Sequence, residues 1–167
     1  TKDKKLLYAI EHMNAVALAL DSINWHCIDK NGDCSVEALC FLANLSFSQG
    51  HFKLAVEALQ KATKKELTAE IKDKIYCDMG YCLLKCGKPE LAIEAFLQVS
   101  KATYNSTVGK ALAYFKASQF EESYAVYETV LNWLATSDLD KAYVLLAMSA
   151  MIYAFQGDSD AKTILFQ

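Results

Sequence analysis

Apolar residues along the chain recur at the three- and four-residue spacing of helices that bury one face, and short turns interrupt this pattern. The pattern predicts an opening helical stretch followed by four helix pairs, about nine helices in all. Residues 29–33 are a predicted loop, and Ser35, Thr68 and Asp138 are predicted N-caps. The predicted helices cover about 3–26, then 35–49 with 52–65, 69–86 with 89–101, 105–117 with 120–136, and 139–156 with 159–167.

In each of the four pairs, one turn joins the two helices, and the residues around these turns repeat. The turn residues are Gly50, Gly87, Ser118 and Gly157. A small residue lies seven positions before each turn residue, and a large apolar residue lies nine positions after it. After the first three turns, a small residue also lies at position five and an apolar one at position twelve. The residues are, in these four sets, Ala43, Gly80, Ala111 and Ala150; Leu59, Phe96, Tyr127 and Phe166; Ala55, Ala92 and Ser123; and Ala62, Val99 and Val130.

This repetition predicts how the helices pack. A glycine at the turn allows the left-handed conformation that ends a helix, and Pro89 suits the first turn of the helix that follows. Small residues are needed where two antiparallel helices cross closely, and a large residue then fills the space between one pair and the next. The sequence therefore predicts an all-α solenoid of antiparallel helix pairs.

The repeated segments resemble the tetratricopeptide repeat (TPR) family, in which a repeat has about 34 residues. Residues 39–62, 76–99 and 111–130 carry the resemblance. The spacing of the small residues departs from regularity, no Trp occupies its usual place in the first helix, and Lys162 stands where a small residue is expected. The resemblance implies an opening helix and loop at 1–34, TPR-like repeats at 35–66, 69–102 and 105–136, and an incomplete repeat at 139–167. Because neither end is capped, we expect the native chain to continue beyond both.

A closer resemblance is to the family of large TPR scaffold subunits of superkiller (Ski) complexes. It rests on residues 107–116, 121–124, 127–128, 140–142, 156–157 and 161–166. The resemblance implies a non-catalytic scaffold that holds a DExH RNA helicase and WD40-propeller subunits together. It further implies a contribution, through the cytoplasmic exosome, to 3′-to-5′ mRNA decay, with a nuclear pool left open. The alternative is a general TPR adaptor that binds a peptide or a partner helix in its concave groove.

Composition narrows the classes of function. With 53% hydrophobic and 22% charged residues, six Gly and one Pro, the chain is neither disordered nor all-β. All 17 basic residues are lysines, which disfavours specific binding to nucleic acid because arginine is the preferred base and phosphate ligand. The longest apolar stretch, 142–155, is shorter than the roughly 20 residues of a membrane span. Charge is uneven: residues 53–88 have eight lysines against five acids, and residues 119–160 have seven acids against one lysine.

No group of residues has the spacing of a catalytic or metal site. Cys82 and Cys86 share a helix face, but His12, His26 and His51 supply no further ligands at zinc-site spacing. His26 and Cys27 are adjacent, so they would point in different directions from a helix. The sequence therefore predicts no catalytic residues, no metal and no cofactor. Free cysteines in this number favour a reducing compartment.

The predicted functional surface is the concave face, which the resemblance assigns to the first helix of each pair. Chaperone-binding TPRs need Lys, Asn and Arg there, and only Asn44 fits, so that function is disfavoured. The face is instead apolar and aromatic. It binds a partner protein or is covered by neighbouring repeats, and the sequence leaves both readings open. The mapped positions are Cys40, Asn44, Phe47, Cys77, Tyr81, Leu84, Val108, Leu112, Phe115, Ala147, Met151 and Ala154; the predicted partner-binding residues among them are Asn44, Phe47, Tyr81, Leu112, Phe115 and Met151.

Overall fold

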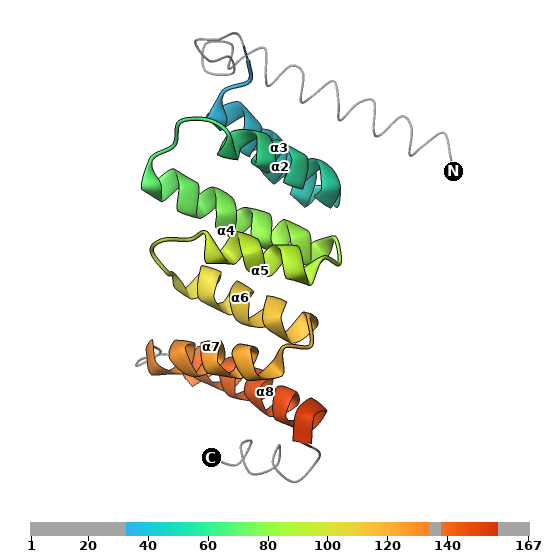
Figure 1. The fold of residues 1–167 in the computed structure, drawn as a ribbon, viewed down its shortest axis with the longest axis vertical. Coiled ribbons are helices and arrows are strands. Elements are labelled where there is room, and N and C mark those ends of the chain that lie inside the picture. Colours follow the sequence, from blue (N-terminus) through green and yellow to red (C-terminus); the bar gives the residue numbers. More distant parts are fainter. Residues whose placement is uncertain (1–32, 134–137, 157–167) are drawn as a thin grey trace, which may run out of the picture. The chain divides into compact units, whose positions relative to one another are not determined.

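The computed structural model describes residues 33–133 and 138–156, and the regular elements in these ranges are seven helices, α2 to α8 (Figure 1). This part of the chain has the all-α fold that the sequence predicts. Two of the predicted helices, 3–26 and 159–167, lie outside the described residues. So do His12, His26, Cys27, Gly157, Lys162, Phe166 and the side chain of Ala154.

The chain divides into two compact units, residues 1–65 (unit 1) and 66–167 (unit 2). In unit 1, α2 (Val36–Ser48) and α3 (Phe52–Thr63) form one antiparallel pair. The Ser35 side chain caps α2 by accepting a hydrogen bond of 3.2 Å from the Ala38 N–H, as predicted. The two helices bury small residues against large ones, which lets their backbones approach closely. The buried apolar residues are Leu39, Ala43, Ala55, Val56, Ala58, Leu59 and Ala62.

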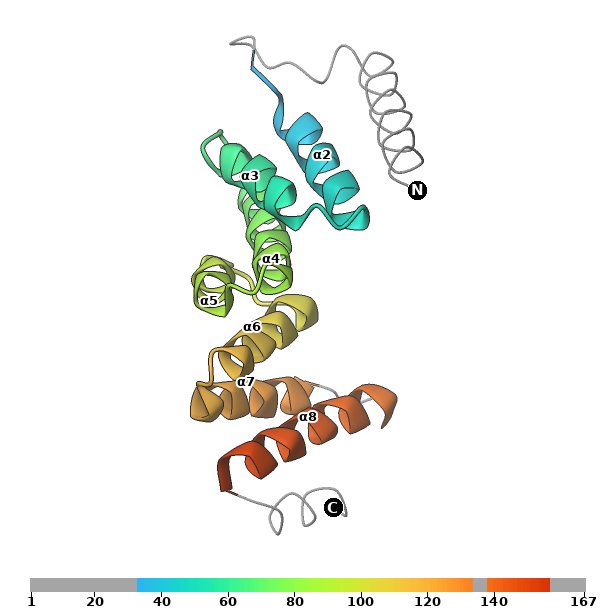
Figure 2. The ribbon, with the colours of Figure 1, turned by 90° about the vertical axis from the view of Figure 1, so that its right-hand side faces the viewer.

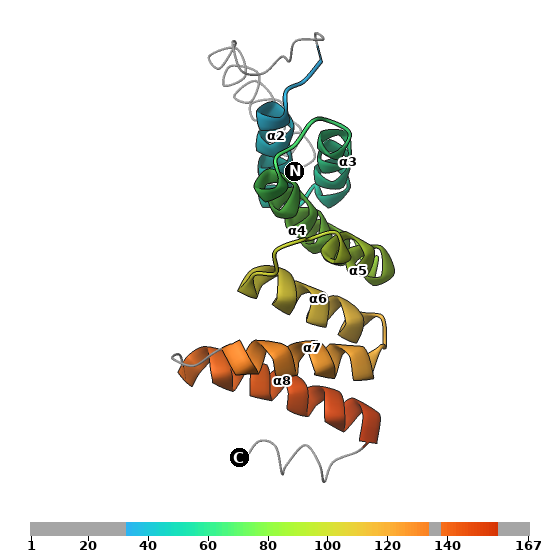
Figure 3. The same cartoon turned by 60° about the vertical axis from the view of Figure 1, so that its left-hand side comes forward.

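Unit 2 contains α4 (Ala69–Lys85), α5 (Pro89–Leu97), α6 (Tyr104–Lys116), α7 (Phe120–Trp133) and α8 (Asp138–Gln156). Each helix packs against the next one along the chain, and α4 also contacts α6. In Figure 2, α5 is seen nearly end-on beside α4 and α6. Figure 3 shows α7 and α8 running alongside each other. The first helices of two successive pairs, α4 and α6, therefore meet, as they do in a solenoid.

Three turns have the same hydrogen bonds, which explains the repetition in the sequence. Gly50, Gly87 and Ser118 have φ angles of 77°, 71° and 60°. In each case the N–H of the next residue donates to a carbonyl five positions back: His51 to Ser46 at 2.8 Å, Lys88 to Leu83 at 3.0 Å, and Gln119 to Tyr114 at 2.9 Å. This is the Schellman motif, which needs one left-handed residue.

Ser118 is the one turn residue of the three that is not glycine, and it provides a test of this account. A residue with a side chain pays roughly 1–2 kcal/mol in the left-handed region, while glycine loses more chain entropy on folding. We expect Ser118→Gly to raise the free energy of unfolding by about 1 kcal/mol in urea denaturation. Gly87→Ser is the matched reverse change and should lower the free energy of unfolding by a similar amount. A Cβ at Gly87 would meet nothing within 4 Å, so the left-handed backbone is the source of this cost and no steric clash adds to it. Equal and small effects would contradict the account.

Helix α5 ends at Leu97, four residues before the predicted end. The residues that follow it are held by hydrogen bonds to a side chain of α4. The Asp73 carboxylate on α4 accepts hydrogen bonds from the Ser100 N–H at 2.7 Å and the Lys101 N–H at 2.9 Å. The Ser100 hydroxyl donates to the same carboxylate at 2.9 and 3.0 Å. Thr103 then caps α6 in a capping box with Ser106. One carboxylate therefore fixes the path from α5 to α6.

These hydrogen bonds lower the pKa of Asp73, chiefly through the backbone N–H of Ser100 and then that of Lys101. A lowered pKa in the folded state contributes stability above the ordinary carboxyl pKa, and that contribution is lost as the pH falls through the folded value. Asp73→Asn should therefore lower the free energy of unfolding at pH 7, and the difference between the variant and the parent should shrink as the pH falls through the folded pKa of Asp73. Urea denaturation from pH 7 to 2 measures this.

Candidate protein-interaction surface

The contact between α4, α5 and α6 is built around one aromatic ring, Phe96, which is 3% exposed. A Cβ added at Gly80 on α4 or at Gly109 on α6 would lie 2.5 Å from Phe96 Cζ. The tip of the ring therefore fills the space that two glycines leave between α4 and α6. This arrangement, here called the Phe96 socket, is the predicted role of Gly80 and Phe96. Gly109 was missed, and the signal for it would have been a glycine inside a helix.

Tyr81 covers the Phe96 socket from the α4 side. Its ring meets the Phe96 ring edge to face, with centroids 5.3 Å apart and planes at 87°. Its hydroxyl donates a hydrogen bond of 2.6 Å to the Asn105 carbonyl on α6. Burial raises the pKa of Tyr81 to about 12, so the phenol stays protonated at neutral pH. Tyr81 is half-buried, and it both joins α4 to α6 and presents part of its ring to solvent.

Phe47 and Phe115 occupy the same position, three residues before a turn residue, and they make the same contact. Each ring meets the first aromatic residue of the following helix edge to face. The centroids of Phe47 and Phe52 are 5.3 Å apart, and those of Phe115 and Phe120 are 5.5 Å apart. Phe47 is 37% exposed, and Phe115 is half-buried against the core of α6, α7 and α8. Both rings therefore pack across a turn and leave part of their surface exposed to solvent.

The remaining predicted residues divide between surface and core. Asn44 is exposed on α2, and Leu112 is half-buried on α6. Met151 is 2% exposed and packs in the core of unit 2. On α8 the buried stripe includes Val144, Met148 and Met151, and the core that they enter also contains Ala111, Tyr127 and Val130. Met151 therefore offers no accessible surface to a partner. Among the α8 side chains that the structure describes, the exposed large ones are instead Leu139, Tyr143 and Leu146.

The thiols on α4 have the properties of packing residues. Burial raises the pKa of Cys77 to about 11 and that of Cys82 to about 12, so both thiols are protonated at neutral pH and are poor nucleophiles. Over residues 33–133 and 138–156, no three His, Cys, Asp or Glu side chains are grouped to hold a metal ion. None of the helices in the described ranges combines the length and the apolar character that a bilayer crossing requires.

The family comparison matches the helix pairs directly. The model of the family described as "Tetratricopeptide repeat" matches residues 36–64 and 73–106, which contain α2 with α3 and nearly all of α4 with α5. The chain contains tetratricopeptide repeats. The TPR fold supports a role as a protein-interaction scaffold, since stacked repeats present extended surfaces to partners.

Curated relatives are similar over most of this TPR chain. Superkiller complex protein 3 of Homo sapiens and that of Mus musculus are each 33% identical to it in an alignment of 130 residues that covers 74% of the chain. Tetratricopeptide repeat protein 37 of Xenopus laevis is 31% identical over 117 residues, 70% of the chain. The chain spans 8% of the length of the two mammalian relatives and 7% of the length of the third.

Solved structures share the TPR fold at low sequence identity. A structure described as MamA MSR-1 C2 aligns with a TM-score of 0.70 and 17% identity, over 95% of this chain and 86% of that one. A structure of PilF from Pseudomonas aeruginosa aligns with a TM-score of 0.59 and 17% identity, over 78% of this chain and 58% of that one. At such identity these likenesses speak for the fold alone.

Proposed function

We propose that this chain is a block of a non-catalytic TPR scaffold of the superkiller type, which holds protein partners together in the cytoplasm. The partners in this proposal are a DExH RNA helicase and WD40-propeller subunits. The assembly then assists the exosome in 3′-to-5′ mRNA decay. The observation that carries the proposal is the 33% identity to superkiller complex protein 3 over 130 residues.

Two features of the described residues support a binding role without chemistry of its own. The half-buried apolar side chains Tyr81, Leu112 and Phe115 lie on the first helices of their pairs, where a partner could cover them. The protonated thiols of Cys77 and Cys82 provide no nucleophile near them. RNA would be handled by the helicase, which agrees with a chain that has 17 lysines and no arginine.

Affinity capture of the full-length parent from cytosol tests the proposal. We expect a DExH helicase and WD40 proteins to co-purify at stoichiometric levels. Chaperones, or a spread of unrelated clients, in place of these proteins would contradict it. A matched pair of variants locates the contact. Leu112→Asp changes a half-buried side chain on α6, and Leu91→Asp changes a side chain on α5 that is 45% exposed. Loss of the partners in the first variant alone, with unchanged circular dichroism, would assign the contact to α6.

A second candidate is a general TPR adaptor that binds a linear peptide. The observation that favours it is the set of apolar side chains on α4 and α6 with exposed lysines beside them. A saturable complex between the 167-residue chain and one short peptide would support this candidate. It differs from the first candidate in requiring no helicase or WD40 protein in the captured material.

A further inference from the structure

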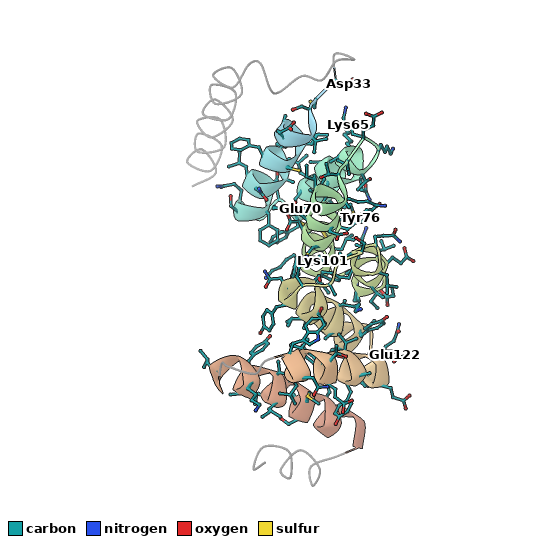
Figure 4. All side chains as sticks on the ribbon, turned by 90° about the vertical axis from the view of Figure 1, so that its left-hand side faces the viewer. Asp33, Lys65, Glu70, Tyr76, Lys101 and Glu122 are labelled. Carbon is teal, nitrogen blue, oxygen red and sulfur yellow. The ribbon has the colours of Figure 1, made fainter. Side chains whose placement is uncertain are left out.

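Residues 98–103, which join α5 to α6, lie at the surface of unit 2. Ser100, Lys101 and Ala102 are exposed, and none of residues 98–103 belongs to a helix. The Asp73 carboxylate holds this segment through the N–H groups of Ser100 and Lys101 and through the Ser100 hydroxyl, at distances between 2.7 and 3.0 Å. We call these hydrogen bonds the Asp73 anchor. Figure 4 shows Lys101 where the chain passes from α5 to α6.

The Ser100 hydroxyl lies against a charged group. Its Oγ is 3.0 Å from Oδ1 and 2.9 Å from Oδ2 of Asp73, and the lowered pKa of Asp73 keeps this carboxylate ionised at neutral pH. The exposed hydroxyls of Ser48 and Thr63 donate instead to backbone carbonyls of their own helices, each at 2.7 Å. A negative charge added to Ser100 therefore meets a second negative charge, whereas one added to Ser48 or Thr63 meets neutral groups.

A phosphate on Ser100 is incompatible with the Asp73 anchor for two reasons. It removes the proton that the hydroxyl donates to the carboxylate, and it adds a charge of about −1.5 to −2 at contact distance from that carboxylate. Lys72 and Lys101 offset part of this repulsion, but both are exposed, so solvent screens their attraction for the phosphate. The arrangement favours release of the segment over a new ion pair.

We propose that Ser100 is a phosphorylation site, and that a phosphate on Ser100 releases residues 98–103 from α4. The reaction is phosphoryl transfer from ATP by a protein kinase. The bond between the Ser100 Oγ and the γ-phosphorus forms as the bond from that phosphorus to the ADP oxygen breaks. The hydroxyl proton passes to a base of the kinase. The exposed, non-helical segment around Ser100 gives a kinase access to the hydroxyl.

Release of this segment acts on the contact between α4 and α6. Thr103 caps α6 three residues after Ser100, and the Asn105 carbonyl then accepts the 2.6 Å hydrogen bond from the Tyr81 hydroxyl. A freed segment no longer fixes the start of α6 against α4. Tyr81 and Leu112 of the candidate interaction surface lie on these two helices, so phosphorylation weakens partner binding. This last step rests on the scaffold function, while the effect on the fold does not.

Phosphoserine placed genetically at Ser100 in the 167-residue chain tests the effect on the fold. We expect a lower urea midpoint and roughly tenfold faster hydrogen exchange at the Ser100 and Lys101 amides, because these amides lose their carboxylate acceptor. Phosphoserine at Ser48 is the matched control. It adds the same charge at an exposed hydroxyl that meets a carbonyl, and it should leave both readouts nearly unchanged.

Removal of the carboxylate tests the cause. In Asp73→Asn, phosphoserine at Ser100 should shift the urea midpoint by less than half of the shift in the parent, because the repelling charge is gone. Ser100→Ala removes only the hydroxyl and keeps both N–H donors, so it should shift the midpoint less than phosphoserine does. Mass spectrometry of the full-length parent, purified with phosphatase inhibitors, should find phosphate on the peptide that contains Ser100.

Four results would overturn the proposal. These are a parent without phosphate on Ser100, equal shifts from phosphoserine at Ser48 and at Ser100, an unreduced shift in Asp73→Asn, and a higher urea midpoint, which would show that the phosphate pairs with Lys72 or Lys101. None of these measurements involves a partner. Absence of the helicase and WD40 proteins from captured material contradicts the scaffold function alone, so the two proposals fail separately.

Discussion

Replacing Phe96 with alanine is expected to lower the free energy of unfolding by about 3–5 kcal/mol. The ring is 3% exposed, and it fills the space between α4 and α6 that two glycines leave open. Its removal leaves a cavity that the glycines cannot fill and takes away the edge-to-face partner of Tyr81. Urea denaturation followed by circular dichroism measures the loss. Leu97→Ala, at a neighbouring side chain that is 56% exposed, should cost less than about 1 kcal/mol.

The same socket predicts the sign of a glycine substitution. Alanine is a better helix former than glycine by about 1 kcal/mol, so Gly109→Ala would stabilise an unconstrained helix. Here its Cβ would lie 2.5 Å from Phe96 Cζ and 2.8 Å from Tyr81 Cζ, and overpacking costs about 1–3 kcal/mol. We expect a net loss of stability that is partly recovered when Phe96→Leu is added, which a double-mutant cycle measures. A gain of about 1 kcal/mol from Gly109→Ala alone would show that no ring fills this space.

The features that the sequence predicted are those set within one helix pair. A Schellman turn needs a left-handed residue at one position, so Gly50 and Gly87 mark it wherever the flanking residues are helical. The pairing of a small residue with a large one is likewise fixed at a constant distance from the turn, which identified Gly80 and Phe96. Such local rules survive in a repeat because each pair must bury the same faces.

The features that the sequence did not predict depend on contacts that lie at no constant distance from a turn. The Asp73 carboxylate holds Ser100 and Lys101 far along the chain, and no local spacing links these residues. Gly109 is required by a ring on another helix. The face that α8 turns toward the core is set by the residues that it packs against. Met151 was predicted to bind a partner because it has the same distance from its turn as Tyr81 on α4 and Leu112 on α6. On α8 this position is buried.

The candidate site has the same limit, since its residues also hold the fold together. The Tyr81 hydroxyl donates a hydrogen bond to α6, and the rings of Phe47 and Phe115 pack across turns. Substitutions at these residues therefore change stability as well as binding. A test of binding therefore needs residues whose side chains only face solvent.

Replacing Met151 with alanine is expected to lower the free energy of unfolding by about 2–5 kcal/mol. Met151 is 2% exposed and lies in one core with Tyr127 and Val130, so its loss leaves a cavity among α6, α7 and α8. If Met151 instead faced a partner, the isolated chain would lose less than about 1 kcal/mol, as at exposed Leu97. Urea denaturation of both alanine variants separates the two cases. Met151→Leu, which conserves volume, should cost less than about 1.5 kcal/mol, and an equal cost for the leucine and alanine variants would contradict a packing role.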